Sequence, residues 1–195
     1  MRAWCLIAVS ALVSLATIDS AAIALPLVRL AQADASHRVL ARFAPDTSDY
    51  IRATAMGDNF DVQAGKVAQA KTRSDDVQRF AQMMVAEHAS ASDGLSAILR
   101  QNAFAFTLPA TLDDEHTAMV RELDDSQRAD FDRRYMQQQI DALQSALRVQ
   151  GAYAHGGRDL LLRRFAAESV PKIRAQLELA GQTVARMNRV ALRLR

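Results

Sequence analysis

Residues 74–101 read SDDVQRFAQMMVAEHASASDGLSAILRQ, and this stretch decides the fold. Ser74 is suited to an N-cap because its hydroxyl accepts from a free first-turn amide, and the acids that follow it favour the positive end of a helix dipole. Apolar residues then recur every three or four positions along the chain, and this spacing places them on one helical face. That face consists of Val77, Phe80, Ala81, Met84, His88, Ala91, Leu95, Ile98 and Leu99. The stretch predicts an amphipathic helix that ends near Gln101 or Asn102.

Three more long helices and one short helix are predicted around it. The long ones cover residues 48–71, the segment from the turn at 124–126 to the glycine pair 156–157, and the segment from about 162 to 184. The short helix covers residues 113–123, after a connector that contains Leu108-Pro109. Long amphipathic segments joined by short links favour a four-helix bundle.

Two of the predicted helices contain irregular features. The apolar pattern of residues 48–71 is only partly periodic, and Gly57 and Gly65 allow either a close helix approach or a bend. In the last helix, Pro171 predicts either a kink or a restart with Ser169 near the cap.

The composition supports a single all-α domain. The chain has 195 residues, of which 50% are hydrophobic, and this suffices for one core. It contains only 7 glycines, 4 prolines and 6% aromatic residues, a composition that favours helix over strand. We therefore expect an all-α fold with the bundle domain at residues 47–181, preceded by a tether at residues 34–46.

The N-terminus has the order of a secretory signal. Residues 1–24 carry Arg2, an apolar run and then small residues, with a possible cut after Ala24 or alternatively after Ala33. The apolar run is shorter than the roughly 20 residues that a hydrocarbon core requires, and Asp19 follows it. We expect an exported, periplasmic protein. The alternative is an uncleaved N-terminal anchor in the inner membrane.

The single cysteine and the charges are unevenly placed. Cys5 lies inside the signal, so the mature chain cannot form a disulfide. Residues 34–181 carry 18 Lys+Arg and 21 Asp+Glu, whereas residues 182–195, the basic tail, carry four arginines and no acid. These arginines are Arg186, Arg189, Arg193 and Arg195. The tail is either a solvated helix end or a contact for an anionic membrane surface or an envelope protein, and export argues against nucleic acid.

Several segments together resemble a known family. They are DNFDVQAGK (58–66), FAQMMVAEH (80–88), LPATLDDEH (108–116), FDRRYMQQQ (131–139) and FAAESVPKIRAQLELA (165–180). The chain resembles the exported bacterial family called domain of unknown function 4142, over about residues 49–180. The resemblance implies a ferritin-like four-helix bundle with a short extra helix between helices two and three, and it implies no settled activity.

The ferritin-like relationship raises the hypothesis of a metal site. Di-iron bundles need several inward glutamates and a Glu-x-x-His on each of two helices, and this sequence contains no Glu-x-x-His. The resemblance implies acids in the first helix and histidines in the other three. Here the first helix holds Asp61 and Gln63 at those positions, and the second helix holds Glu87 and His88. The third helix holds Leu143 and the fourth holds Gln176. We therefore expect no metal site and no polar cluster in the interior, and the nearest candidate ligands are Glu87, His88 and Asp61.

The remaining polar residues have structural interpretations. We expect His88 to be a partly buried histidine hydrogen-bonded across the bundle, and the acids at residues 113–115 to favour the start of a helix. No catalytic or cofactor-binding residue is assigned. The sequence predicts a non-enzymatic envelope protein that acts by binding or in a stress response. The alternative is a ferritin-like metal-binding protein or oxidoreductase, and the oligomeric state is left open.

Overall fold

The computed structural model describes residues 46–193, and every element in that range is a helix. The helices are α2 (Thr47–Lys71), α3 (Asp75–Gln101), α4 (Asp114–Asp125), α5 (Arg128–Gly156) and α6 (Leu160–Arg193). The prediction of an all-α fold is confirmed. The predicted signal at residues 1–24 and the predicted tether at residues 34–46, except Asp46, lie outside the described residues.

Side-chain caps fix where four of the helices begin, and the cap of α6 is Asp159. Asp46 accepts from the amides of Ser48 and Asp49 at the start of α2, and Ser74 accepts from the amide of Val77 at the start of α3. Asp113 accepts from the amide of His116 at the start of α4. Each cap satisfies amides that have no partner within the helix, so these polar residues set the helix boundaries.

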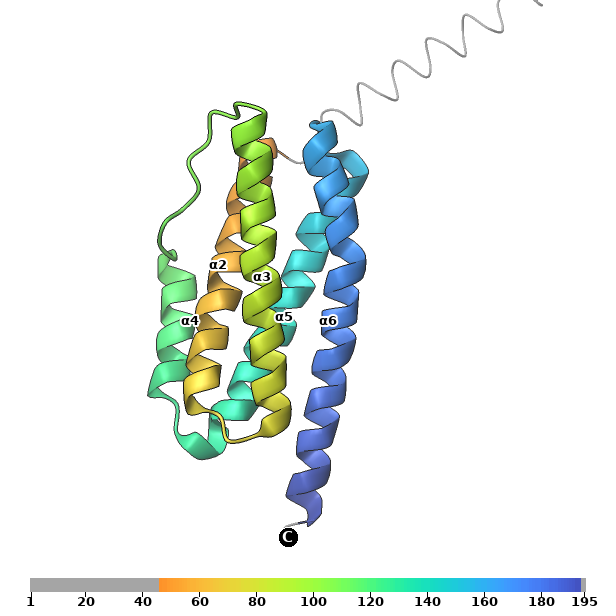
Figure 1. Ribbon diagram of the computed structural model, residues 1–195. Coiled ribbons are helices and arrows are strands. Elements are labelled where there is room, and N and C mark those ends of the chain that lie inside the picture. Colours follow the sequence, from red (N-terminus) through yellow and green to blue (C-terminus); the bar gives the residue numbers. More distant parts are fainter. Residues whose placement is uncertain (1–45, 194–195) are drawn as a thin grey trace, which may run out of the picture. The chain divides into compact units, whose positions relative to one another are not determined.

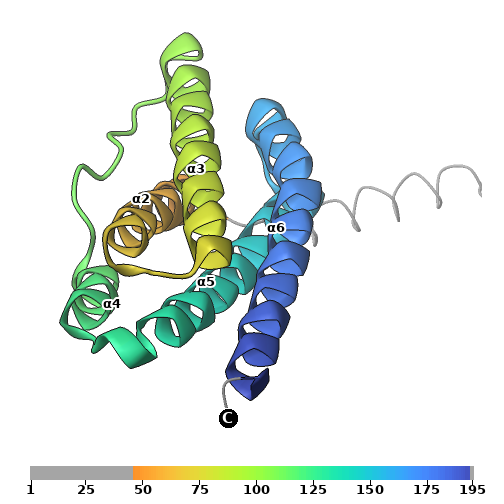
Figure 2. The ribbon, with the colours of Figure 1, turned by 60° about the horizontal axis from the view of Figure 1, so that its bottom comes forward.

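The four long helices form a bundle of two antiparallel hairpins (Figure 1). One hairpin is α2 and α3, and the other is α5 and α6; α2 packs on α5, and α3 packs on α6. A long connector and α4 lead from the end of α3 back to the start of α5, and α4 lies outside the bundle against α2 (Figure 2). The predicted four-helix bundle with a short extra helix between helices two and three is therefore confirmed.

The last helix is continuous through Pro171 and into the basic tail. Of the two predicted alternatives, a kink at Pro171 or a restart with Ser169 near the cap, the restart is wrong because Pro171 lies inside α6. The Ser169 hydroxyl donates to the carbonyl of Phe165. The helix also continues past residue 181 into the basic tail, where Thr183 is fully buried. Arg186 forms an ion pair with Asp76 at the start of α3, at 3.2 Å. The first turns of the tail thus belong to the bundle.

The apolar core is divided into two clusters. A large apolar cluster includes Phe60, Phe80, Met84, Phe131, Tyr135, Met136, Leu143 and Ile173. A small apolar cluster comprises Tyr50, Ile51, Ala55, Leu95, Leu99, Tyr153, Leu162 and Ala166. Each of the four long helices contributes residues to both clusters, and the change from one cluster to the other falls at the same level of the bundle. It falls between Ala55 and Phe60 on α2, Met84 and Leu95 on α3, Leu143 and Tyr153 on α5, and Ala166 and Ile173 on α6. Polar side chains occupy that middle level.

None of the helices in residues 46–193 combines the length and the apolar character that crossing a bilayer requires.

Gly65 allows α2 and α3 to approach closely, and its replacement tests this contact. A Cβ there would lie 2.6 Å from Val85 Cγ2 and 3.3 Å from the Ala81 carbonyl oxygen. Valine has essentially one rotamer in a helix, so Gly65→Ala should lower the free energy of unfolding by about 1–2 kcal/mol in urea titrations. Gly151→Ala is the control, because nothing lies within 4 Å of its added Cβ. It should raise stability by about 0.5–1 kcal/mol; equal effects of the two variants would contradict the packing argument.

Candidate functional site

Two aspartates and one histidine meet in the middle of the bundle. Asp58 and Asp61 lie one turn apart on α2, which puts both carboxylates on one helical face. His88 reaches them from α3, with its Nδ1 2.8 Å from Asp58 Oδ1 and 3.4 Å from Asp61 Oδ2. The three residues are only 7%, 1% and 6% exposed, in the order Asp58, Asp61, His88. They form the buried acidic cluster.

Burial and charge set the protonation of this cluster. Burial by itself would lower the pKa of His88, but the carboxylates of Asp61 and Asp58 outweigh it and raise that pKa to about 9. Burial raises the pKa of Asp61 to about 6, against the opposing effect of His88. Burial also raises the pKa of Asp58, opposed by its hydrogen bond to His88. At neutral pH the imidazole is therefore protonated, and Asp61 is ionised.

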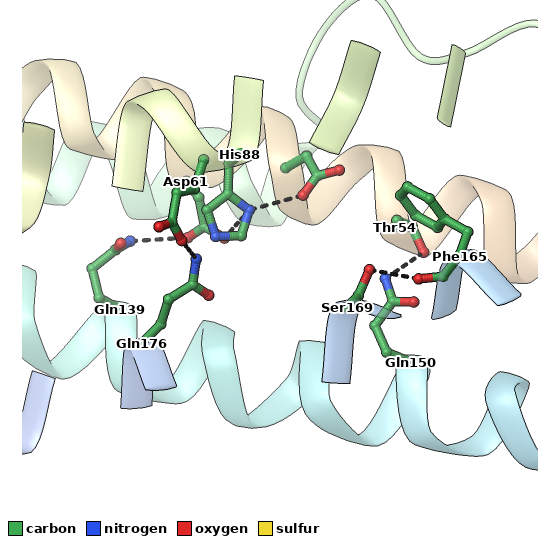
Figure 3. Close-up of polar contacts among 10 residues, drawn as sticks. Thr54, Asp61, His88, Gln139, Gln150, Phe165, Ser169 and Gln176 are labelled. Carbon is green, nitrogen blue, oxygen red and sulfur yellow. Dashed lines mark hydrogen bonds and ion pairs between the residues drawn. The ribbon is translucent and has the colours of Figure 1, made fainter. Parts of the chain in front are cut away.

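Glutamine side chains of α5 and α6 complete the surroundings of the cluster. Gln139 Nε2 donates to Asp61 Oδ1 at 3.1 Å, which leaves the Gln139 oxygen to accept from the buried hydroxyl of Tyr135 at 3.5 Å. Gln176 Nε2 donates to Glu87 Oε2 at 2.6 Å. Figure 3 shows Asp61, His88, Gln139 and Gln176 converging from four helices.

A second polar group lies between the middle level and the small apolar cluster, of which its Tyr50 is a member (Figure 3). Gln150 accepts from the Tyr50 hydroxyl at 2.8 Å and donates to Thr54 Oγ1 at 3.3 Å. Burial raises the pKa of Tyr50 above its ordinary value, so the hydroxyl stays protonated and donates. This group is fully hydrogen-bonded through Gln150 and therefore differs from the buried acidic cluster.

A cavity of about 890 Å³ joins the two polar groups. Residues of α2, α3, α5 and α6 line it, together with Asp113 and His116 at the start of α4. Small residues contribute much of the lining, namely Ala53, Gly57, Ala86, Ser90, Ala91, Gly94, Ala142, Ser145, Ala146 and Ser169. Because these side chains are short and occur on all four long helices, the bundle retains open volume between its two apolar clusters.

Three buried polar atoms at this cavity have no hydrogen-bond partner among residues 46–193. They are Asp58 Oδ2, His88 Nε2 and Gln176 Oε1. Native proteins rarely leave buried polar atoms without a partner, because each one costs about 1–3 kcal/mol of lost hydration. Unpartnered atoms that line a cavity are therefore a signature of a site that binds something.

The sequence predicts only part of this site. Asp61 and His88 meet, and the predicted hydrogen bond of His88 across the bundle is present. Glu87 is exposed and contacts Gln176 instead of the cluster. The expectation that the interior holds no polar cluster was wrong. Asp58 was missed, although its spacing of one turn from Asp61 was a usable signal.

The site does not fit a ferritin-like metal centre. No group of three or more His, Cys, Asp or Glu side chains in the described part of the chain is arranged to hold an ion. Both carboxylates approach Nδ1 of His88, so they pair with the imidazole instead of joining its Nε2 around a common point. The corresponding positions in α5 and α6 hold the buried side chains Leu143 and Gln176.

The fold and this interior define a helical bundle protein with a buried acidic site. The profile of the domain of unknown function family DUF4142 matches residues 31–183, and the chain belongs to that family. The predicted family is thereby confirmed. A comparison with curated proteins finds no match.

One solved structure supports the architecture. The chain is similar to the crystal structure of a DUF305 fragment from Deinococcus radiodurans, with a TM-score of 0.63 and 12% sequence identity. The similarity covers 73% of this chain and 98% of that one. At this sequence identity, the similarity is evidence for the fold alone.

The protonated state of His88 predicts how stability depends on pH. The folded protein holds a proton that the unfolded chain releases between pH 6.5, the ordinary pKa of histidine, and about 9. This stabilisation is complete below pH 6.5 and is lost as the pH rises through 9. We expect the free energy of unfolding to fall by about 2–3 kcal/mol between pH 6.5 and 9.5, measured by urea titration.

The matched variants are His88→Gln and His155→Gln. The first removes the buried imidazole and should abolish most of the pH dependence. The second changes an exposed histidine near the end of α5 and should leave the dependence intact. An unchanged slope in His88→Gln would contradict the assignment.

Proposed function

We propose that this protein is a non-enzymatic binding protein of the cell envelope, and that it takes a small molecule into the cavity in the middle of its bundle. The observation that carries the proposal is the coincidence of open volume with unpartnered buried atoms at the same place. Pockets that enclose small molecules have volumes of about 300–1,000 Å³ and combine apolar walls with a few polar groups. The cavity meets both criteria.

The chemistry of His88 favours binding over catalysis. A general base works best when its pKa lies near the working pH, because it must accept a proton there. The pKa of His88 is raised to about 9, so at neutral pH the ring already carries the proton. A side chain in that state supplies a fixed charge and a hydrogen-bond donor, which suits recognition of a ligand.

Filling the cavity tests the proposed function. Ala146 lies on α5 and lines the cavity, so Ala146→Phe should occupy much of the space that a ligand needs. We expect that at least one member of a chemically mixed set of cations, anions and neutral compounds raises the melting temperature of the unmodified protein. The same compound should have no effect on Ala146→Phe.

The control for this experiment is Ala175→Phe. Ala175 is exposed on α6 and does not line the cavity, so the added ring leaves the open volume unchanged. The control variant should respond to the compound as the unmodified protein does. A full screen without a single stabilising compound, or equal stabilisation of Ala146→Phe, would reject the proposed function.

Export to the periplasm is the second part of the proposal. It is supported by the signal-like order of residues 1–24, which contain a basic residue, an apolar run and then small residues. The full chain expressed in a bacterial host should appear in the periplasmic fraction, and its intact mass should correspond to a start at Leu25 or Asp34. A full-length mass in the membrane fraction would instead favour the uncleaved anchor.

A further inference from the structure

The lining of the cavity carries an excess of negative charge. Its acidic residues are Asp49, Asp58, Asp61, Glu87, Asp113 and Glu168. Among the described lining residues, the lysines and arginines are Lys172 and Arg52, and Arg52 already pairs with Asp49 at 3.1 Å. Low-dielectric walls that carry one sign of charge concentrate the potential inside a cleft. The cavity therefore attracts cations and repels anions.

Two of the three unpartnered atoms are acceptors and require a hydrogen-bond donor from the ligand, whereas the third, His88 Nε2, is a donor in the imidazolium. Asp58 uses Oδ1 to accept from His88, so Oδ2 has spare capacity to accept. Gln176 uses its nitrogen to donate to Glu87, and its oxygen is therefore also a spare acceptor. The acidic side chains of the cavity lining also outnumber its lysines and arginines. A single positive charge with several N–H groups matches both requirements.

The apolar part of the lining lies against the small apolar cluster. Val149 and Phe165 contribute to it beside the small residues, and Phe165 comes within 3.4 Å of the position that a Cβ of Gly94 would take. The volume of about 890 Å³ is far larger than an ion or an ammonium group alone requires. The ligand must therefore have an organic body as well as a charge.

We propose that the ligand is a small organic cation, an amine with an apolar body, whose ammonium group donates to Asp58 Oδ2 and Gln176 Oε1. An ammonium group has three donors, so it satisfies both acceptors and keeps one donor for a water or a third oxygen. The apolar body lies along Val149 and Phe165. This inference rests on the proposed function and adds the chemical class of the ligand to it.

Matched compounds test the charge requirement directly. For each of three skeletons (2-phenylethyl, hexyl and cyclohexylmethyl), the amine, the corresponding alcohol and a carboxylate of similar size are titrated calorimetrically into the protein at pH 7.5 and low salt. We expect at least one amine to bind about tenfold more tightly than its alcohol, and we expect no carboxylate to bind. The alcohol keeps the shape and loses only the charge.

Two variants locate the ammonium group. Asp58→Asn keeps the shape of the side chain and removes the charge, so it should reduce amine affinity about tenfold or more and leave alcohol affinity within about twofold. Asp93→Asn is the matched control, since Asp93 is exposed on α3 and lies outside the cavity lining. Gln176→Met removes the second acceptor at similar size and covers the case in which Asp58→Asn does not fold, as judged by circular dichroism.

The outcomes separate this inference from the proposed function. If alcohols or carboxylates bind as tightly as amines and Ala146→Phe abolishes that binding, the protein binds small molecules, but the assignment of its ligand as an organic cation is wrong. If amine preference persists in both Asp58→Asn and Gln176→Met, the position of the ammonium group is wrong. If no compound in either experiment binds, both proposals fail. Stoichiometric uptake of Cu²⁺ or Fe²⁺ alone, lost in His88→Ala, together with no amine binding, overturns the inference in favour of a metal.

Discussion

The sharing of one imidazole by two buried carboxylates is the constraint on which the rest of the interior depends. A carboxylate loses several kcal/mol of hydration when it enters a protein interior, so it must find charge and hydrogen bonds there. His88 supplies the charge for both Asp58 and Asp61, and its Nδ1 lies within 3.4 Å of each of them. One imidazole serves two carboxyl groups, and burial raises the pKa of both. The free oxygen of Asp58 is a consequence of this arrangement.

The division of the core explains how the bundle tolerates this charge. Large side chains such as Phe80 and Tyr135 pack on one side of the middle level, and Tyr50 and Tyr153 stack on the other side with ring centroids 3.8 Å apart. Apolar burial in these clusters provides the stabilisation that holds the helices in place. The middle level therefore does not have to be close-packed, and short side chains there leave a cavity instead of a collapsed core.

The sequence predicted the fold well because the fold depends on periodic patterns. The apolar face of residues 74–101, the caps at Ser74 and Asp113 and the glycines at 156–157 act locally, and the helices begin and end where these residues predict. The site was predicted only in part, because it depends on which polar residues face inward at one level of four helices. The weak apolar pattern of residues 48–71 contained the signal, since Asp58 and Asp61 occupy interior positions of that helix. This weak pattern was interpreted as irregular packing. The sequence of one helix cannot show that His88 of another helix lies opposite its two aspartates.

The same interior explains why this bundle departs from the metal-binding pattern of ferritin-like proteins. A metal centre needs carboxylates and imidazoles from facing helices to point at one position, so that strong bonds to the ion replace hydration. Here the facing helices offer Leu143, which is apolar, and Gln176, whose side chain is a neutral amide and carries neither a carboxylate nor an imidazole. The middle of the bundle therefore contains an open cavity that is lined by acidic side chains on one side and by apolar side chains elsewhere. Such a site recognises volume and charge together, and an organic cation has both whereas a bare ion has only the charge.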